Sequence, residues 1–294
     1  MALRHMVPVL AGVVLAGAGS VSAQTTADPE VEKGAYLVKA AGCVGCHTAK
    51  RGEPFAGGYA LNTPFGTFYS PNITPHPEHG IGGWSDDDFV AALHEGIRPA
   101  GGRYFPVFPY PSYTKMTRAD ALAIKAYLFS LEPVDQANQA HDVSFPFSIR
   151  FFQRGWQMLN FSEGRFEPDA SQSDKINRGA YLVQALAHCG ECHTPRNIMG
   201  GTDDDMFLAG TPDGPEGELS PNITPHETGI ADWSERDIAQ LLKTGMKPDF
   251  DNVQGTMVEA IEDGLKDLTD ADIEAIAAYL KTVPPIENRV VSNK

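Results

Sequence analysis

The chain has 294 residues and a formal net charge of −15, from 38 acidic and 23 basic side chains. This length suits two domains of ordinary size. Such an acidic chain is repelled by nucleic-acid phosphates and by anionic lipid, which argues against either as the main partner. The charge fits attraction to a positive protein surface, or solubility alone.

Residues 1–23 have the pattern of a secretory signal peptide. Arg4 and His5 form a short basic start, residues 6–18 are apolar or small, and Ala23 ends a small-residue cleavage site. The apolar run is too short to cross a bilayer comfortably. Together with the haem motifs described next, it predicts an exported, periplasmic protein.

The sequence Cys-Xaa-Xaa-Cys-His occurs twice, and the two copies use all four cysteines of the chain. In this motif each cysteine forms a thioether with a haem vinyl group, and the histidine becomes the proximal iron ligand. The motifs therefore predict two covalent c-type haems. The predicted attachment residues are Cys43, Cys46, Cys189 and Cys192, and the predicted proximal ligands are His47 and His193.

Other uses of paired cysteines fit less well. A zinc site needs both pairs at one ion, yet they lie far apart in sequence. A thioredoxin-like pair needs no histidine after the second cysteine. Structural disulfides leave both histidines unexplained.

The motifs belong to a longer internal repeat. Gly-Ala-Tyr-Leu-Val precedes each motif, and Ser-Pro-Asn-Ile-Thr-Pro-His begins at both Ser70 and Ser220. Because the features keep the same order, each half is predicted to be one haem domain. The expected divisions are residues 24–133, a linker over 134–173, and residues 174–294.

Each repeat is expected to be mostly α-helical, with a few helices and long loops around its haem. A first helix leads into the motif. Capping boxes begin a middle helix at Ser85 and Ser234 and a closing helix at Thr117 and Thr269. The residues expected to face the core of the closing helices are Leu122, Ala126, Phe129, Ile273, Ala277 and Leu280. The residues expected to pack where the first and closing helices cross are Tyr36, Tyr127, Tyr181 and Tyr279.

The linker is long and rich in aromatic residues between Phe145 and Phe161, with Arg150 and Arg154 among them. Two interpretations remain open. The segment packs across both domains and fixes their orientation, or part of it forms an apolar patch for a partner subunit or a membrane surface.

The second axial ligand decides the chemistry of each haem, because His–Met ligation fills the iron and favours electron transfer. Met116, just before the closing helix, is the predicted distal ligand in the first domain. Met257 is the prediction in the second domain, and Met246 aligns with Ile97 on the middle helix. His76 and His226 occupy the same position in the two repeats and are rival distal ligands. The alternative is that both are ordinary residues of a surface loop.

These motifs, together with Trp84-Ser85 and Tyr110-Pro111-Ser112-Tyr113, resemble the cytochrome c subunits of bacterial membrane-associated alcohol, gluconate and sugar dehydrogenases. The familiar subunits have three haem motifs, and this chain has two. The resemblance implies a non-catalytic subunit that passes electrons from a dehydrogenase with a flavin, molybdenum or quinone cofactor to quinone, a cytochrome or a terminal oxidase. Peripheral membrane association would come through the partner.

We therefore expect a periplasmic dihaem cytochrome that transfers electrons from a dehydrogenase to the respiratory chain. One alternative is a dihaem oxidoreductase, such as a peroxidase or a thiosulfate-oxidising cytochrome, which needs an open or unusual distal position. The other is a free-standing soluble carrier.

Overall fold

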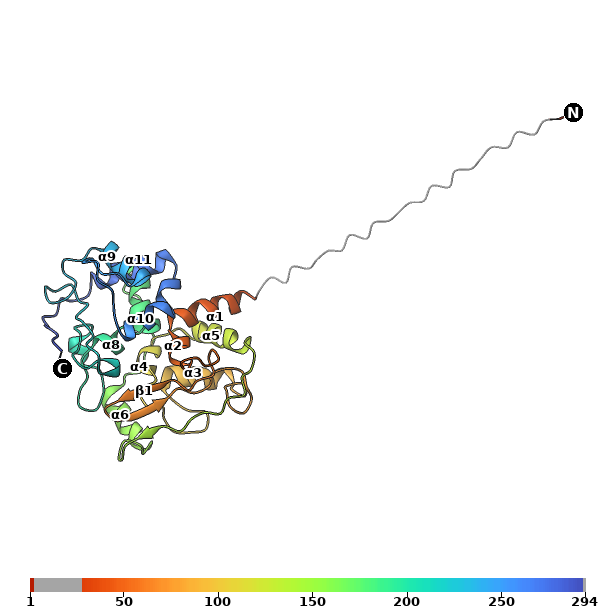
Figure 1. Ribbon diagram of the computed structural model, residues 1–294, viewed down its shortest axis with the longest axis horizontal. Coiled ribbons are helices and arrows are strands. Elements are labelled where there is room, and N and C mark those ends of the chain that lie inside the picture. Colours follow the sequence, from red (N-terminus) through yellow and green to blue (C-terminus); the bar gives the residue numbers. More distant parts are fainter. Residues whose placement is uncertain (3–27, 293–294) are drawn as a thin grey trace.

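The computed structural model describes residues 1–2 and 28–292, so the predicted signal peptide lies almost entirely outside the described residues. The chain is mostly α-helical, as the sequence predicted (Figure 1). Among the described residues, no helix combines the length and the apolar character needed to span a bilayer. The helices before the linker are α1 (Pro29–Ala40), α2 (Cys43–Cys46), α3 (Asp86–Glu95), α4 (Tyr110–Tyr113) and α5 (Arg118–Phe129).

The second half repeats this order of elements. Helix α7 (Asp174–Tyr181) continues into a buried π-helical turn, η1 (Leu182–Leu186), before the second haem motif. Short 3₁₀ turns occupy η2 (Asp204–Met206), η3 (Pro215–Gly217) and η4 (Leu265–Asp267). Between the halves lies α6 (Phe152–Asn160), and the helices after it are α7 (Asp174–Tyr181), α8 (Gly190–His193), α9 (Glu235–Thr244), α10 (Thr256–Glu262) and α11 (Asp270–Leu280).

A small antiparallel sheet, which the sequence did not predict, attaches the linker to the first domain. Strand β1 (Ala60–Thr63) pairs with β2 (Gly66–Tyr69), and β2 pairs with β3 (Asp142–Val143). These strands are only two to four residues long, so they lack the alternating hydrophobic pattern that identifies a strand in a sequence. The sheet holds the beginning of the linker to the first domain.

In each domain the first and closing helices cross at a glycine. A Cβ atom on Gly34 of α1 would lie 1.9 Å from the carbonyl oxygen of Ala123 in α5. A Cβ atom on Gly179 of α7 would lie 1.9 Å from the carbonyl oxygen of Ala275 in α11. The glycine before each Ala-Tyr-Leu-Val sequence therefore lets the two helix backbones touch.

The caps of the middle helices are as predicted. Ser85 forms a complete capping box with Asp88, and Ser234 forms one with Asp237. The predicted core face of α11 is also confirmed, since Ile273, Ala277 and Leu280 are buried there. In α5 the predicted Leu122 and Phe129 pack against the core but are only partly buried. The fully buried apolar side chains of α5 are Ala121, Ala123, Ile124 and Leu128.

The closing helices have the predicted N-caps, because the Thr117 and Thr269 hydroxyls accept the N–H groups of Asp120 and Asp272. The return bond of each box differs from the prediction, because a tyrosine of the other domain completes it. The Thr117 N–H donates to the Tyr181 hydroxyl at 3.1 Å, and that hydroxyl donates to Asp120 Oδ2 at 2.5 Å. An ordinary capping box would connect the carboxylate directly to the N-cap N–H. Here the tyrosine of the second domain lies between them.

The reciprocal contact links the first domain to the second. The Thr269 N–H donates to the Tyr36 hydroxyl at 3.3 Å, which donates to Asp272 Oδ2 at 2.6 Å. Each carboxylate also receives a cation of its own domain, Lys33 at Asp120 and Arg178 at Asp272. We call these two arrangements the bridged caps. Tyr36 and Tyr181 join the domains, and their predicted role at the helix crossings was wrong.

The helix crossing can be tested with Gly34→Ala, compared with Gly155→Ala on α6. The Gly34 variant must separate α1 from α5, and overpacking of this kind costs about 1–3 kcal/mol. A Cβ on Gly155 would meet no atom within 4 Å, so alanine there is expected to gain about 0.8–1 kcal/mol from helix propensity. Denaturant unfolding of the holoprotein measures both changes. Equal stability of Gly34→Ala and the natural protein would contradict the crossing.

The bridged caps predict a defined dependence of stability on pH. Burial raises the pKa of Asp120, but hydrogen bonds from Lys33 and Tyr181 outweigh burial, so the net pKa is lowered. Because the pKa of this carboxyl is lower in the folded protein, its ionised form stabilises the fold at pH values above the unfolded pKa, near 4. That stability is lost as the pH falls through the folded pKa. Tyr181→Phe is expected to shift acid unfolding to higher pH, whereas Tyr127→Phe is not. Acid titrations followed by circular dichroism test this, and identical transitions would refute it.

Candidate haem sites

Each predicted attachment motif forms one short helix directly after the first helix of its domain. Cys43 and Cys46 bound α2, and Cys192 and His193 end α8. All four thiols are free of disulfide bonds. Burial raises the pKa of Cys43, Cys189 and Cys192 to about 12, so these groups are neutral thiols. Neutral thiols are not the activated thiolates of a redox pair, which argues against a thioredoxin-like function.

Both motif histidines are oriented by a proline carbonyl. Nδ1 of His47 lies 2.8 Å from the Pro71 oxygen, and Nδ1 of His193 lies 2.8 Å from the Pro221 oxygen. A carbonyl oxygen only accepts hydrogen bonds, so each Nδ1 carries the proton and each Nε2 has a free lone pair. Burial also lowers the pKa of both imidazoles and keeps them neutral. This is the tautomer that a proximal ligand needs.

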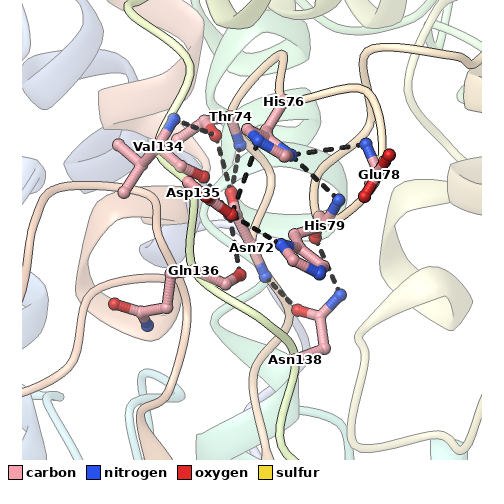
Figure 2. Close-up of polar contacts among 9 residues, drawn as sticks. All are labelled: Asn72, Thr74, His76, Glu78, His79, Val134, Asp135, Gln136 and Asn138. Carbon is pink, nitrogen blue, oxygen red and sulfur yellow. Dashed lines mark hydrogen bonds and ion pairs between the residues drawn. The ribbon is translucent and has the colours of Figure 1, made fainter.

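The repeated Ser-Pro-Asn-Ile-Thr sequence supplies this carbonyl and fixes it in place. The Asn72 amide donates to the Val134 oxygen at 2.8 Å, and its Oδ1 accepts the Thr74 N–H at 2.9 Å (Figure 2). In the second domain, Asn222 repeats the pattern with the Ile286 oxygen and the Thr224 N–H. The sequence repeat therefore has a physical cause: a buried asparagine ties each carbonyl-bearing loop to the chain after the closing helix.

The rival ligands His76 and His226 serve as turn acceptors. Nδ1 of His76 accepts the backbone N–H groups of Glu78 and His79 (Figure 2). Nδ1 of His226 accepts that of Thr228. In a neutral imidazole that accepts at Nδ1, the proton is on Nε2. Neither nitrogen then offers a lone pair to a metal. This also argues against a cation at the cluster of His76, His79 and Asp135, whose donor atoms lie within 4.8 Å of one another.

That cluster is the only group of three or more metal-binding side chains found within the described residues. No cysteine takes part in it. The two cysteine pairs therefore do not meet at a zinc ion.

The predicted distal ligands both lie before the closing helix of their domain. Met116 lies between α4 and α5, directly before the Thr117 N-cap, and is fully buried. Met257 lies in the first turn of α10 and is half-buried against the core. Met246 was wrongly placed on the middle helix, because α9 ends at Thr244. It forms an isolated bridge with Asn252, as Ile97 does with Arg103, so its alignment with Ile97 agrees with the structure. The two distal ligands stay predictions.

Each haem motif also contacts the distal-ligand segment of the other domain. Glu191, inside the second motif, accepts a 2.8 Å hydrogen bond from Ser112 on α4. A Cβ atom on Gly45, inside the first motif, would lie 3.1 Å from Oδ2 of Asp263, which caps α10. Burial, Glu191 and, to a smaller extent, Cys46 of the other motif raise the pKa of Cys192. Both sites therefore adjoin the domain interface.

Two histidines near these sites, His188 and His94, were expected from sequence to have no special role. His188 stacks edge-on against Tyr113 of the other domain, with ring centroids 5.5 Å apart. His94 is fully buried on α3, and burial lowers its pKa to about 4, so it is neutral. Neither histidine has an equivalent in the other half of the chain. Recurrence in the internal repeat, which was the available sign of a functional role, was therefore missing for both.

The donor set fits covalent haem c in both domains. Each motif supplies two free neutral thiols and an imidazole with Nε2 available. Each domain also has a thioether sulfur, Met116 or Met257, in the segment before its closing helix.

Comparison with known proteins places both halves of the chain in one family. The cytochrome c family model matches residues 31–132 and 176–284. A diheme cytochrome c-type protein of Cereibacter sphaeroides is 42% identical, with 97% of this chain and 99% of that protein covered. The fructose dehydrogenase cytochrome subunit of Gluconobacter japonicus is 44% identical, covering 87% of this chain. The alcohol dehydrogenase (quinone) cytochrome c subunit of Gluconobacter oxydans is 36% identical, covering 94%.

The matches differ in how much of each relative they cover. This chain spans only 53% of the fructose dehydrogenase subunit and 59% of the alcohol dehydrogenase subunit. Two matched segments, each with one attachment motif, imply two covalently bound haem c groups. The chain belongs to the cytochrome c family and is an electron-transfer cytochrome with two haem domains.

Proposed function

We propose that this cytochrome accepts electrons from a partner dehydrogenase in the periplasm and passes them to the respiratory chain. When bound, each haem c supplies a one-electron ferric/ferrous couple. The protein attaches it through two cysteines, orients the proximal imidazole through a proline carbonyl, and offers a methionine as the distal ligand. Similarity to cytochrome subunits of fructose and alcohol dehydrogenases supports the dehydrogenase partner.

One structural observation carries the relay part of this proposal. Each attachment motif contacts the distal-ligand segment of the other domain, at Glu191–Ser112 and at Gly45–Asp263. Both haem sites therefore adjoin the same domain interface, which is the arrangement that transfer between two haems requires. The buried Tyr113 donates its hydroxyl to the Ala41 oxygen, just before the first motif, and its ring contacts His188, just before the second motif.

The partner can be tested with a candidate dehydrogenase purified from the organism that makes this protein. Oxidised holoprotein, purified dehydrogenase and the dehydrogenase substrate are mixed, and haem reduction is followed by absorbance. We expect reduction only when all three are present, and a rate that falls with salt because exposed charges steer the encounter. Reduction by substrate alone, or none with a fully active dehydrogenase, would refute the proposed function.

The distal ligands predict two distinct spectroscopic changes. Met116→Ala is expected to open the first haem, and Met257→Ala the second, to an added ligand such as imidazole. Each change removes the weak near-infrared band of methionine–iron ligation from one haem. Met246→Ala is the matched control and should leave both haems unchanged.

Absorbance and electron paramagnetic resonance of the ferric protein measure these changes. A changed second haem in Met246→Ala would contradict the choice of Met257. A high-spin haem in the natural protein that reacts rapidly with peroxide would favour the dihaem oxidoreductase instead.

A further inference from the structure

The outer face of α6 and the segment before it form an exposed apolar surface. We call this surface the linker patch. In Figure 1, α6 and the segment before it lie at the lower edge of the ribbon, away from α1 and α11. Its side chains are between 52% and 86% exposed, and they are Phe145, Phe151, Phe152, Met158 and Leu159.

Helix α6 is amphipathic in the reverse of the usual sense. Its polar side faces the protein: the Gln157 amide donates to the Glu95 oxygen, and Asn160 accepts a bond from Asn197. Trp156 is on the same side and donates to the Met199 oxygen. These bonds join α6 to both domains. A surface helix normally buries its apolar face, so the outward apolar face indicates contact with an apolar environment.

The patch is bordered by arginines that lack a carboxylate partner. Arg103, Arg150 and Arg154 form no ion pair within the described part of the chain. Arg150 donates to the Arg103 oxygen and lies 4.3 Å above the Phe105 ring. Arg98 is near enough to Arg150 to lower its pKa, although burial has the larger effect.

The local charge is therefore positive on a chain whose net charge is −15. An apolar helix face bordered by arginines is typical of a helix that lies in a membrane interface. We propose that the linker patch binds a lipid bilayer surface, with the phenylalanines in the acyl boundary and the arginines at the headgroup phosphates. The net charge of the whole chain argues against this contact, but the charge at this face does not.

Vesicle flotation of the holoprotein tests the proposal directly. The vesicles contain phosphatidylcholine alone or phosphatidylcholine with phosphatidylglycerol. We expect the natural protein to float with both and more with the anionic lipid, and Arg154→Gln to reduce only that increase. The double variant Phe151→Ser, Met158→Ser is expected to bind at least about tenfold more weakly, because two large apolar side chains no longer leave water.

Phe250→Ser is the matched control, because Phe250 is an exposed phenylalanine outside the patch. It should bind vesicles as the natural protein does. Circular dichroism and haem absorbance establish that the variants are folded.

Three results would overturn the proposal. The first is no binding of the natural protein to either vesicle, and the second is undiminished binding of the double variant. The third is evidence that the linker patch binds a protein rather than lipid. In that case the double variant no longer self-associates, or is no longer reduced by the dehydrogenase in detergent, while its vesicle binding equals that of the natural protein. Reduction by the dehydrogenase without vesicles tests the proposed function separately.

Discussion

The two bridged caps hold the haem domains together. In each, a tyrosine of one domain lies between the N-cap N–H and the N3 carboxylate of the other domain's closing helix. The carboxylates of Asp120 and Asp272 are mostly buried, so their charges need partners, and the tyrosine and a nearby cation supply them. Helix capping and domain docking therefore depend on the same hydrogen bonds.

This dependence extends to the haem sites. The tyrosines of the bridged caps lie on the helices that lead into the attachment motifs, and the caps lie just after the distal-ligand segments. Docking one domain on the other therefore brings each motif to the distal segment of its partner. The glycines at the helix crossings make this possible, because they let each first helix touch the closing helix of its own domain. The contacts between each motif and the other domain's distal-ligand segment are reciprocal because the two domains repeat the same order of elements.

Much of the local structure could be predicted from sequence, because its signals are local. The motifs, the middle-helix caps and the predominance of helix needed only short-range patterns. The role of Tyr36 and Tyr181 could not be predicted, because a tyrosine before a haem motif looks the same whether it packs within its domain or bonds across an interface. Asp120 fits a capping box in sequence, yet its carboxylate bonds to the other domain. The reversed orientation of α6 depends on partners such as Glu95, which are distant in sequence.

Two haem sites at one interface form an internal relay for electrons. One-electron reduction by pulse radiolysis tests it, with less than one electron delivered per protein and the two haems followed separately by absorbance. We expect the electron to redistribute between the haems at a rate independent of protein concentration. A rate that rises in proportion to protein concentration would mean transfer between molecules and would contradict it.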